Sequence, residues 1–277
     1  MTKPVFSVLM SIYHKESPHY FDLSLESLHN QSAAAGEIVL VQDGPLTDAL
    51  SKVIRKWEKR FENKLKIVDL ETNVGLSKAL NHGLNHCRFD WVARMDTDDI
   101  CLPERLAVQA EFISQNPDID ILGSYATTID ETGAAKKLLK VPLDHERIKK
   151  LVWSCPMIHP TVCFRRDKIL AIGGYNPDAG PRQDDYDLWF RCAIAGYRFA
   201  NIPQPLLLYR FTDDQVRKNT LKVGYHRLKV GIKGNRLLKA GPIAYIGVMV
   251  PFVRALLPYP LNVWFYKLFS KVNPRNQ

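Results

Sequence analysis

Three carboxylates lie within four residues at Asp96-Thr97-Asp98-Asp99. Carboxylates this close repel one another, and a hard divalent cation such as Mg²⁺ or Mn²⁺ relieves the repulsion because it prefers oxygen ligands. A cation held here can bridge a diphosphate and neutralise the charge of a departing nucleoside diphosphate. The same four residues also fit a solvated acidic turn, since an isolated Asp-x-Asp triplet is common in turns.

A second acidic pair, Asp184 and Asp185, opens a segment with helical spacing. Two carboxylates at a helix start interact favourably with the helix dipole, which is a sufficient structural reason for them. The functional alternative is a general base that takes the proton from an attacking hydroxyl.

A third segment, residues 73–81, combines a turn glycine with a helix start. Gly75 lets the backbone approach a ligand, and the helix amides that follow can face an anion. Asn73 and Lys78 are then candidates to contact a nucleotide. An ordinary helix start explains the same residues equally well.

The elements that position these groups alternate between strand and helix in the first half of the chain. Apolar strand-like runs at 5–10, 37–41, 65–70 and 91–95 are separated by helical patterns, one of which places Ala49, Val53, Trp57 and Phe61 four residues apart. This order predicts a parallel sheet covered by helices, with ligands beyond the carboxyl ends of the strands. Asp43 and the acidic cluster each follow such a strand, so we expect them at the same edge.

The second half is less regular. We expect helices at 103–115, 144–153 and 184–194, strands at 119–129, 138–141, 158–164 and 206–211, and a turn at Gly173-Gly174. A basic helical segment is predicted from 212 to about 239.

Composition indicates a globular protein with an uneven charge. The chain has 277 residues and a net charge of +9, yet residues 215–277 hold 12 Lys or Arg and no acidic residue. The preceding 214 residues therefore carry a net charge of −3. The five cysteines form no metal-ligand spacing and indicate reduced thiols, and neither a secretory leader nor a membrane span is predicted.

Several of these motifs occur together and in order: residues 7–13, 37–45, 73–84, 94–99, 159–161, 173–175 and 184–185. As a set, the chain resembles the family 2 glycosyltransferases, of the type that builds bacterial O-antigen or capsule repeat units. The resemblance implies the GT-A fold, an α/β fold with a mostly parallel central sheet, flanking helices and here a basic helical C-terminal appendage. It implies a catalytic domain at 1–212, with a nucleotide half at about 1–100 and an acceptor half at about 101–212, and a tail at 213–277.

The resemblance also implies a role for each matching residue. Ile12, Tyr13 and Glu16 match the loop that borders the nucleoside, and Asp43 matches the residue that contacts the base. Asp98 matches the direct metal ligand, with Asp96 nearer the ribose and sugar. Asp185 matches the catalytic base, and Asp184 stands where Glu is usual. Residues proposed for the acceptor are His159, Gly174, Tyr175 and Trp189, although His159 beside Pro160 also fits a structural role and Trp189 a core position.

The implied reaction is inverting transfer of glucose or galactose from a UDP-sugar, with Mn²⁺ or Mg²⁺, to an undecaprenyl-diphosphate-linked saccharide. Ser11 and Gln42 depart from the Pro and Asp usual in the family, which weakens the inference about the donor. No Q-x-x-R-W segment is present, which argues against a processive synthase. The basic, aromatic tail at 215–277 predicts peripheral contact with an anionic membrane, on the cytoplasmic face of the bacterial inner membrane, and no nucleic-acid motif is found.

Two other functions are compatible with part of the pattern. A nucleotidyltransferase shares the sheet and the carboxylates, but it needs a Gly-rich phosphate loop, and residues 11–18 contain no glycine. A non-catalytic nucleotide-sugar or membrane adaptor would have no need for Asp98 and Asp185. A dinucleotide oxidoreductase is excluded because no G-x-G-x-x-G follows the first strand.

Overall fold

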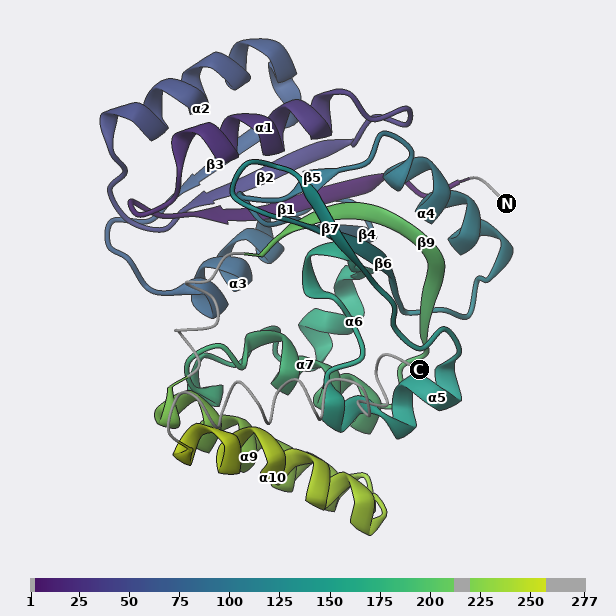
Figure 1. The fold of residues 1–277 in the computed structure, drawn as a ribbon. Helices are drawn as coiled ribbons and strands as arrows, with labels where there is room; N and C mark the ends of the chain where they lie inside the picture. Colours follow the sequence, from purple (N-terminus) through teal and green to yellow (C-terminus); the bar gives the residue numbers. More distant parts are fainter. Residues whose placement is uncertain (1–2, 212–219, 258–277) are drawn as a thin grey trace.

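The computed structural model describes residues 3–211 and 220–257 (Figure 1). Its first half is the predicted alternation. The elements are β1 (Phe6–Ile12), α1 (Pro18–His29), β2 (Glu37–Gln42), α2 (Asp48–Phe61), β3 (Leu65–Asp69), α3 (Leu76–His86) and β4 (Trp91–Arg94). The four strands pair in the order β3-β2-β1-β4 and are all parallel, as predicted.

Helix α2 shows how a sequence period becomes a buried face. The predicted face repeated every four residues, but an α-helix turns once per 3.6 residues, so such a row drifts around the axis. The residues actually buried are Leu50, Ile54, Trp57 and Phe61, while Ala49 lies exposed. The prediction was therefore right at the C-terminal end of the helix and wrong at its start.

The second half extends the same sheet with strands of both directions. It contains β5 (Ile100–Cys101), α4 (Arg105–Gln115), β6 (Ile121–Ile129), β7 (Ala135–Leu139), α5 (His145–Lys150), β8 (Cys163–Arg165), α6 (Arg166–Ala171), α7 (Asp184–Ile194) and β9 (Phe199–Arg210). The full order is β3-β2-β1-β4-β8-β6-β9-β5, with β7 beside β6. Strand β8 is antiparallel to both β4 and β6, whereas β9 is parallel to β6, so the sheet as a whole is mixed.

Two strand predictions in this half are corrected by the structure, and proline explains both. The strand expected at 158–164 is a 3₁₀ turn, His159–Thr161, followed by the short β8, because Pro160 has no N–H to donate to a sheet. The strand expected at 206–211 begins already at Phe199. Pro205 is tolerated inside β9 because the pairing with β6 shifts register there, between Ser124 and Tyr125.

The hydrophobic core lies on both faces of the sheet. Along β1, Val8, Met10 and Ile12 pack on one face with α1 and α2, whereas Leu9 packs on the other with α3 and α7. This is the period of two that a strand buried on both faces requires.

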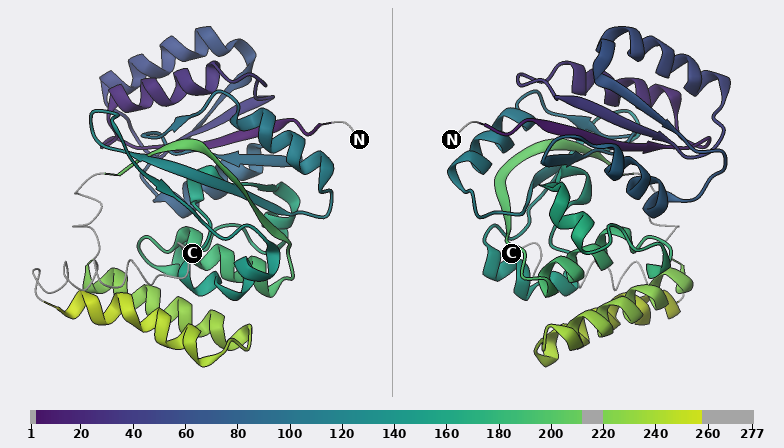
Figure 2. Two further views of the ribbon diagram at one scale, coloured as in Figure 1. Left: turned by 45° about the vertical axis from the view of Figure 1, so that its right-hand side comes forward. Right: turned by 180° about the vertical axis from the view of Figure 1, so that it is seen from behind.

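The described part of the basic tail, residues 220–257, is folded directly against the rest of the protein. Helices α9 (Leu221–Leu237) and α10 (Pro242–Leu256) lie side by side below α7 (Figures 1 and 2). A Cβ at Gly234 would clash with the Phe190 ring, and one at Gly247 would clash with the Trp153 ring, so both helices approach their neighbours at a distance that only glycine allows. The predicted boundary at 212/213 and the aromatic residues from Tyr259 onward lie outside the described residues. Among the described helices, none has the length and apolar character needed to span a bilayer.

Candidate active site

A cleft of about 1020 Å³ lies where the sheet, α7, α9 and α10 meet. Its walls carry Asp96 from the acidic cluster, Asp184 and Asp185 from the start of α7, and His159. Groups that are far apart in the sequence thus line one cavity, as the edge of a parallel sheet predicts. The volume is at the upper end of the usual range for a ligand pocket, so it can hold a large substrate or two substrates.

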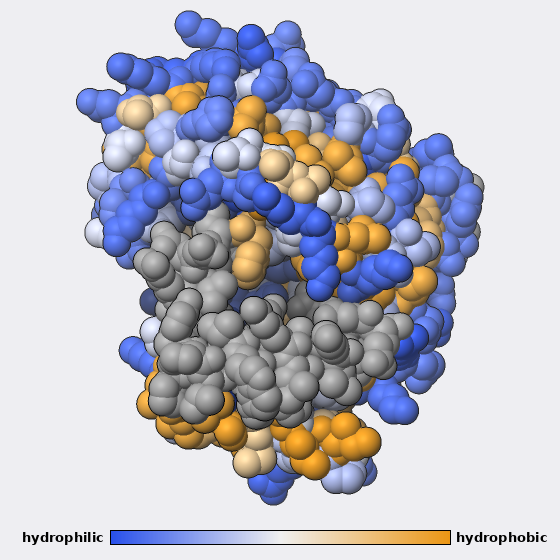
Figure 3. Space-filling model, in the orientation of Figure 1, coloured by the Kyte–Doolittle hydropathy of each residue, from blue (hydrophilic) through white to orange (hydrophobic). Residues whose placement is uncertain are grey.

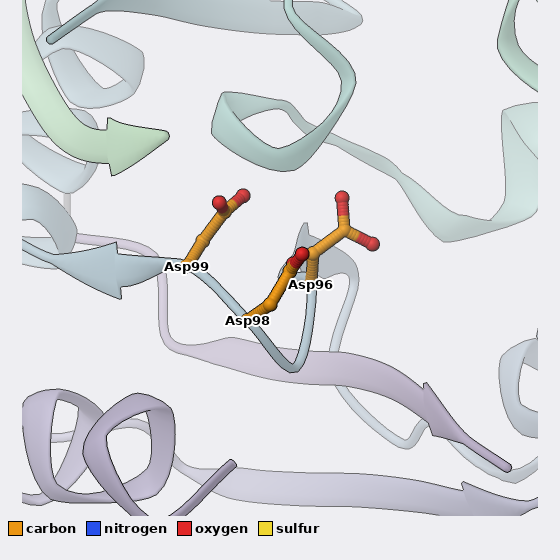
Figure 4. A group of neighbouring side chains, drawn as sticks. All are labelled: Asp96, Asp98 and Asp99. Carbon is orange, nitrogen blue, oxygen red and sulfur yellow. The ribbon is translucent and has the colours of Figure 1, made fainter. Parts of the chain in front are cut away.

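The acidic cluster forms a turn between β4 and β5, with its three carboxylates on the same side (Figure 4). One ligand atom from each of Asp96, Asp98 and Asp99 lies within 4.8 Å of the others. Burial, and then the charge of Asp96, raise the pKa of Asp98 to about 6. Burial and both neighbouring carboxylates raise the pKa of Asp99 well above its usual value. This clustering of charge in a protein interior is unfavourable without a cation.

Two buried arginines hold the acidic turn in place. Arg94 forms an ion pair with Asp96. Arg210, at the end of β9, donates from its backbone N–H to Asp99 Oδ1 at 2.8 Å and from Nε to the Asp98 carbonyl at 2.9 Å. Sequence reasoning missed both arginines. Arg94 lies inside a quoted motif, but Arg210 has no sequence signal that links it to residues more than a hundred positions away.

The cluster fits a divalent metal ion. Its donors are all carboxylate oxygens, which Mg²⁺ and Mn²⁺ prefer. Asp99 Oδ2 is buried and has no hydrogen-bond partner within residues 3–211 and 220–257, so it is available as a ligand. Asp98 and Asp96, the predicted ligands, would hold the ion together with Asp99, which sequence reasoning did not assign.

The loop after β1 lies beside this cluster. Burial, then Glu16 and Asp98, raise the pKa of Tyr13, which places its phenol near both carboxylates. Ile12 is different, because its side chain is fully buried in the core and only its backbone borders the loop. Its carbonyl accepts the N–H of Asp43 at 2.8 Å, which joins the ends of β1 and β2.

Asp43 is used to shape the next loop. Its carboxylate accepts the N–H of Val74 at 2.6 Å and that of Gly75 at 3.0 Å, and Asn73 donates to its carbonyl at 3.1 Å. Asp43 is only 3% exposed. A contact between Asp43 and a nucleotide base therefore stays a prediction.

Gly75 immediately precedes α3, with a φ of 86° and no side-chain cap. Lys78 lies exposed on α3 and is not among the residues that line the cleft.

The acidic pair at the start of α7 has two distinct environments. Asp184 accepts a hydrogen bond from the Ser77 hydroxyl, which ties α7 to α3. Asp185 accepts from its neighbour's N–H at 2.8 Å and from the Cys155 thiol at 3.4 Å. Burial, and then the charge of Asp184, raise the pKa of Asp185. A carboxylate with a raised pKa is a stronger base once ionised, which suits Asp185 to accept a proton.

The four residues predicted to contact the acceptor separate into one cleft residue and three supporting ones. His159 lines the cleft, and its Nε2 lies 2.9 Å from the Tyr175 hydroxyl. Burial lowers the pKa of His159 well below its usual value, so the imidazole is neutral. Tyr175 and Trp189 are fully buried, with rings 5.6 and 6.0 Å from the His159 ring. They support His159 from behind and do not present a face to a sugar, which corrects that expectation.

Gly174 is likewise structural. It has a φ of 66°, and a Cβ there would clash with the Asn81 amide. That amide accepts the N–H of Tyr175 and donates to its carbonyl, both at 2.7 Å. The turn at Gly173-Gly174 therefore fixes Tyr175 against α3, and through it His159.

Comparisons with known proteins agree with this arrangement. The family model described as glycosyl transferase family 2 matches residues 7–173. An amylovoran biosynthesis glycosyltransferase, AmsE of Erwinia amylovora, is 41% identical over 83% of this chain and 87% of its own length. A UDP-Gal:α-D-GlcNAc-diphosphoundecaprenol β-1,3-galactosyltransferase of Escherichia coli is 33% identical over 95% of this chain and 96% of its own length.

Solved structures support the fold. A mannosyltransferase of Pyrobaculum calidifontis in complex with GDP-Man and Mn²⁺ matches 98% of this chain and 81% of its own, with a TM-score of 0.66 and 17% identity. TarS of S. aureus in complex with UDP-GlcNAc matches 97% and 74%, with a TM-score of 0.66 and 20% identity.

These findings set aside both the nucleotidyltransferase and the non-catalytic adaptor. The family model covers more than half of the chain, and a full-length relative at 33% identity is a named glycosyltransferase. The chain belongs to glycosyl transferase family 2 and is a glycosyltransferase with the GT-A fold.

Proposed function

We propose that the enzyme transfers a hexose, glucose or galactose, from a UDP-sugar to a saccharide linked to undecaprenyl diphosphate, with inversion at the anomeric carbon. The single observation that carries the proposal is the shared cleft, which is lined by Asp96 of the acidic cluster and by Asp185. Two relatives support the choice of substrates. One is named for UDP-Gal and a diphosphoundecaprenol acceptor, and another for O-antigen biosynthesis.

In this mechanism Asp185 accepts the proton of the acceptor hydroxyl as its oxygen attacks the anomeric carbon. The new C–O bond forms while the bond to the β-phosphate breaks, and UDP leaves with the bonding electrons. Asp96, Asp98 and Asp99 would hold a divalent ion, which when bound would neutralise the charge of the departing diphosphate. Neutral His159, fixed by Tyr175, borders the same space and is available to hydrogen-bond a sugar hydroxyl without adding charge.

We further propose that the enzyme works at the cytoplasmic face of the inner membrane, with α10 against the bilayer. Apolar side chains of α10 project from the protein, with exposures of 74% at Ile243, 64% at Ile246 and 58% at Leu256. Figure 3 shows orange, apolar side chains along the lower edge of the molecule, next to blue hydrophilic ones. A helix with an apolar face among basic residues suits an anionic membrane surface.

The direct test incubates the full chain with Mn²⁺, a panel of UDP-sugars and a short-chain diphosphate-linked GlcNAc acceptor. Transfer from UDP-Glc or UDP-Gal, lost on chelation, is the expected result. The proposal fails if none of the UDP-sugars is bound, hydrolysed or used. The panel also identifies the sugar, because the choice between glucose and galactose depends on how one hydroxyl is hydrogen-bonded.

A further inference from the structure

The cleft is lined by more cationic side chains than carboxylates. Apart from Arg94, which is paired with Asp96, five cationic residues line it: Lys137, Lys140, Arg182, Arg227 and Arg254. They come from β7 and the residue after it, from the turn before α7, from α9 and from α10. Residues from such separate elements converge on one cavity, and they outnumber its three lining carboxylates, so this part of the cleft favours an anion.

Arg227 interacts with the proposed base, Asp185, and Arg182 lies just before it in the chain. Arg182 stands two residues before Asp184 with a φ of 60°, a conformation that is unfavourable for a residue other than glycine. Arg227 stacks over the Tyr186 ring at 4.1 Å, and its charge counteracts the rise in the pKa of Asp185. A stacked guanidinium keeps its edge available, and that edge matches two phosphate oxygens at once.

The cleft becomes apolar toward α10. Ile243, Ile246 and Val250 form this part of the wall together with Trp153. Ile243 and Ile246 are also the most exposed apolar side chains described, so the apolar wall continues directly into the outer apolar face of α10. One cavity therefore offers an acidic pair, several arginines and a hydrocarbon-like surface to a ligand.

We infer that this part of the cleft is a second diphosphate site, distinct from the donor site, for an isoprenyl diphosphate headgroup and its first isoprene units. Arg182 and Arg227 bind the diphosphate, while Ile243 and Ile246 contact the chain. The inference rests on the proposed function, because it assigns the acceptor side of the same reaction. The donor diphosphate relies on a cation at the acidic cluster, so an acceptor diphosphate near Asp185 needs cations of its own, and the arginines supply them.

The test is binding of farnesyl diphosphate to the full chain by isothermal titration calorimetry, in EDTA so that no metal-held donor site contributes. We expect metal-independent binding that falls about tenfold or more in Arg227→Gln and in Arg182→Gln, as loss of a hydrogen bond to a charged group predicts. Lys233→Gln, an exposed change on α9, is the matched control and leaves the affinity unchanged. Ile243→Ser with Ile246→Ser weakens binding of farnesyl diphosphate but not of inorganic pyrophosphate.

The inference is overturned if farnesyl diphosphate does not bind in EDTA, or if it binds the arginine variants as tightly as the unchanged protein. It is also overturned if Asp98→Asn alone removes the binding, because the probe would then occupy the donor site. UDP binding in Mn²⁺ is measured alongside. If UDP binds but farnesyl diphosphate does not, this inference fails while the proposed donor site stands. Retained UDP binding in the arginine variants shows that they are folded and that the donor site is intact.

Discussion

Asp98→Asn is expected to stabilise the metal-free protein while removing its response to metal. The pKa of Asp98 is raised to about 6 in the folded protein, against an ordinary value of 3.8. A carboxyl group with a raised folded pKa destabilises the fold above that pKa, and the effect disappears as the pH falls through the interval to the unfolded value. A difference of about two pKa units corresponds to at most about 3 kcal/mol at pH 7.5.

The assay is urea denaturation at pH 7.5, in EDTA and in Mn²⁺. In EDTA the variant should gain up to about 3 kcal/mol in free energy of unfolding, because the buried charge of Asp98 and its repulsion by Asp96 are both removed. In Mn²⁺ at about a hundred times its dissociation constant, the unchanged protein should gain about 2.7 kcal/mol and the variant much less. Asp167→Asn, which alters an exposed carboxylate, should change neither value by more than about 0.5 kcal/mol. The reasoning is refuted if Asp98→Asn destabilises the protein in EDTA and Mn²⁺ stabilises both proteins equally.

Three further outcomes follow from the geometry. Because burial raises the pKa of Asp185, kcat at saturating Mn²⁺ and substrates should fall on the acidic side at a higher pH than an ordinary aspartate would give. A fall at or below the pH expected for an ordinary aspartate would contradict this. Gly247→Ala forces a Cβ into the Trp153 ring and should lower the free energy of unfolding by about 1–3 kcal/mol. Gly241→Ala, which has open space around it, is the control and should lower it by less than about 1 kcal/mol. Equal effects of the two substitutions would show that α10 is not closely packed. Met249→Ser with Leu256→Ser should weaken binding to phosphatidylglycerol vesicles at least about tenfold in a flotation assay, and unchanged binding would exclude α10 as the contact.

The parts of the fold that could be predicted from sequence are those set by local periodicity. Strands β1 and β2 were predicted because each is a nearly continuous apolar run buried on both faces, and β3 was predicted although Lys66 and Asp69 are exposed. Strand β9 was predicted too short because Pro203 and Pro205 interrupt its pattern, and only the register shift against β6 accommodates Pro205. The sequence around Pro205 does not show that the pairing with β6 shifts register at this point.

The candidate site divides in the same way. Asp96, Asp98 and Asp185 could be proposed from sequence because carboxylates at strand and helix ends are visible there. Arg210 and Arg227 were missed, since their place depends on how distant strands and helices pack. The tail was predicted as an appendage, but glycines at 234 and 247 allow it to pack closely enough for α9 and α10 to form one wall of the cleft.

The most direct measurement is glycosyl transfer by Asp185→Asn, compared with UDP binding by the same variant in Mn²⁺. A positioned base contributes about 10²–10⁴-fold to the rate, so transfer should fall by that factor while UDP binding stays unchanged. Asp187→Asn, on the same helix and paired with Arg191, is the control for an acidic residue outside the cleft and should keep most of the activity. Normal transfer by Asp185→Asn would contradict the assignment of the base and the mechanism built on it.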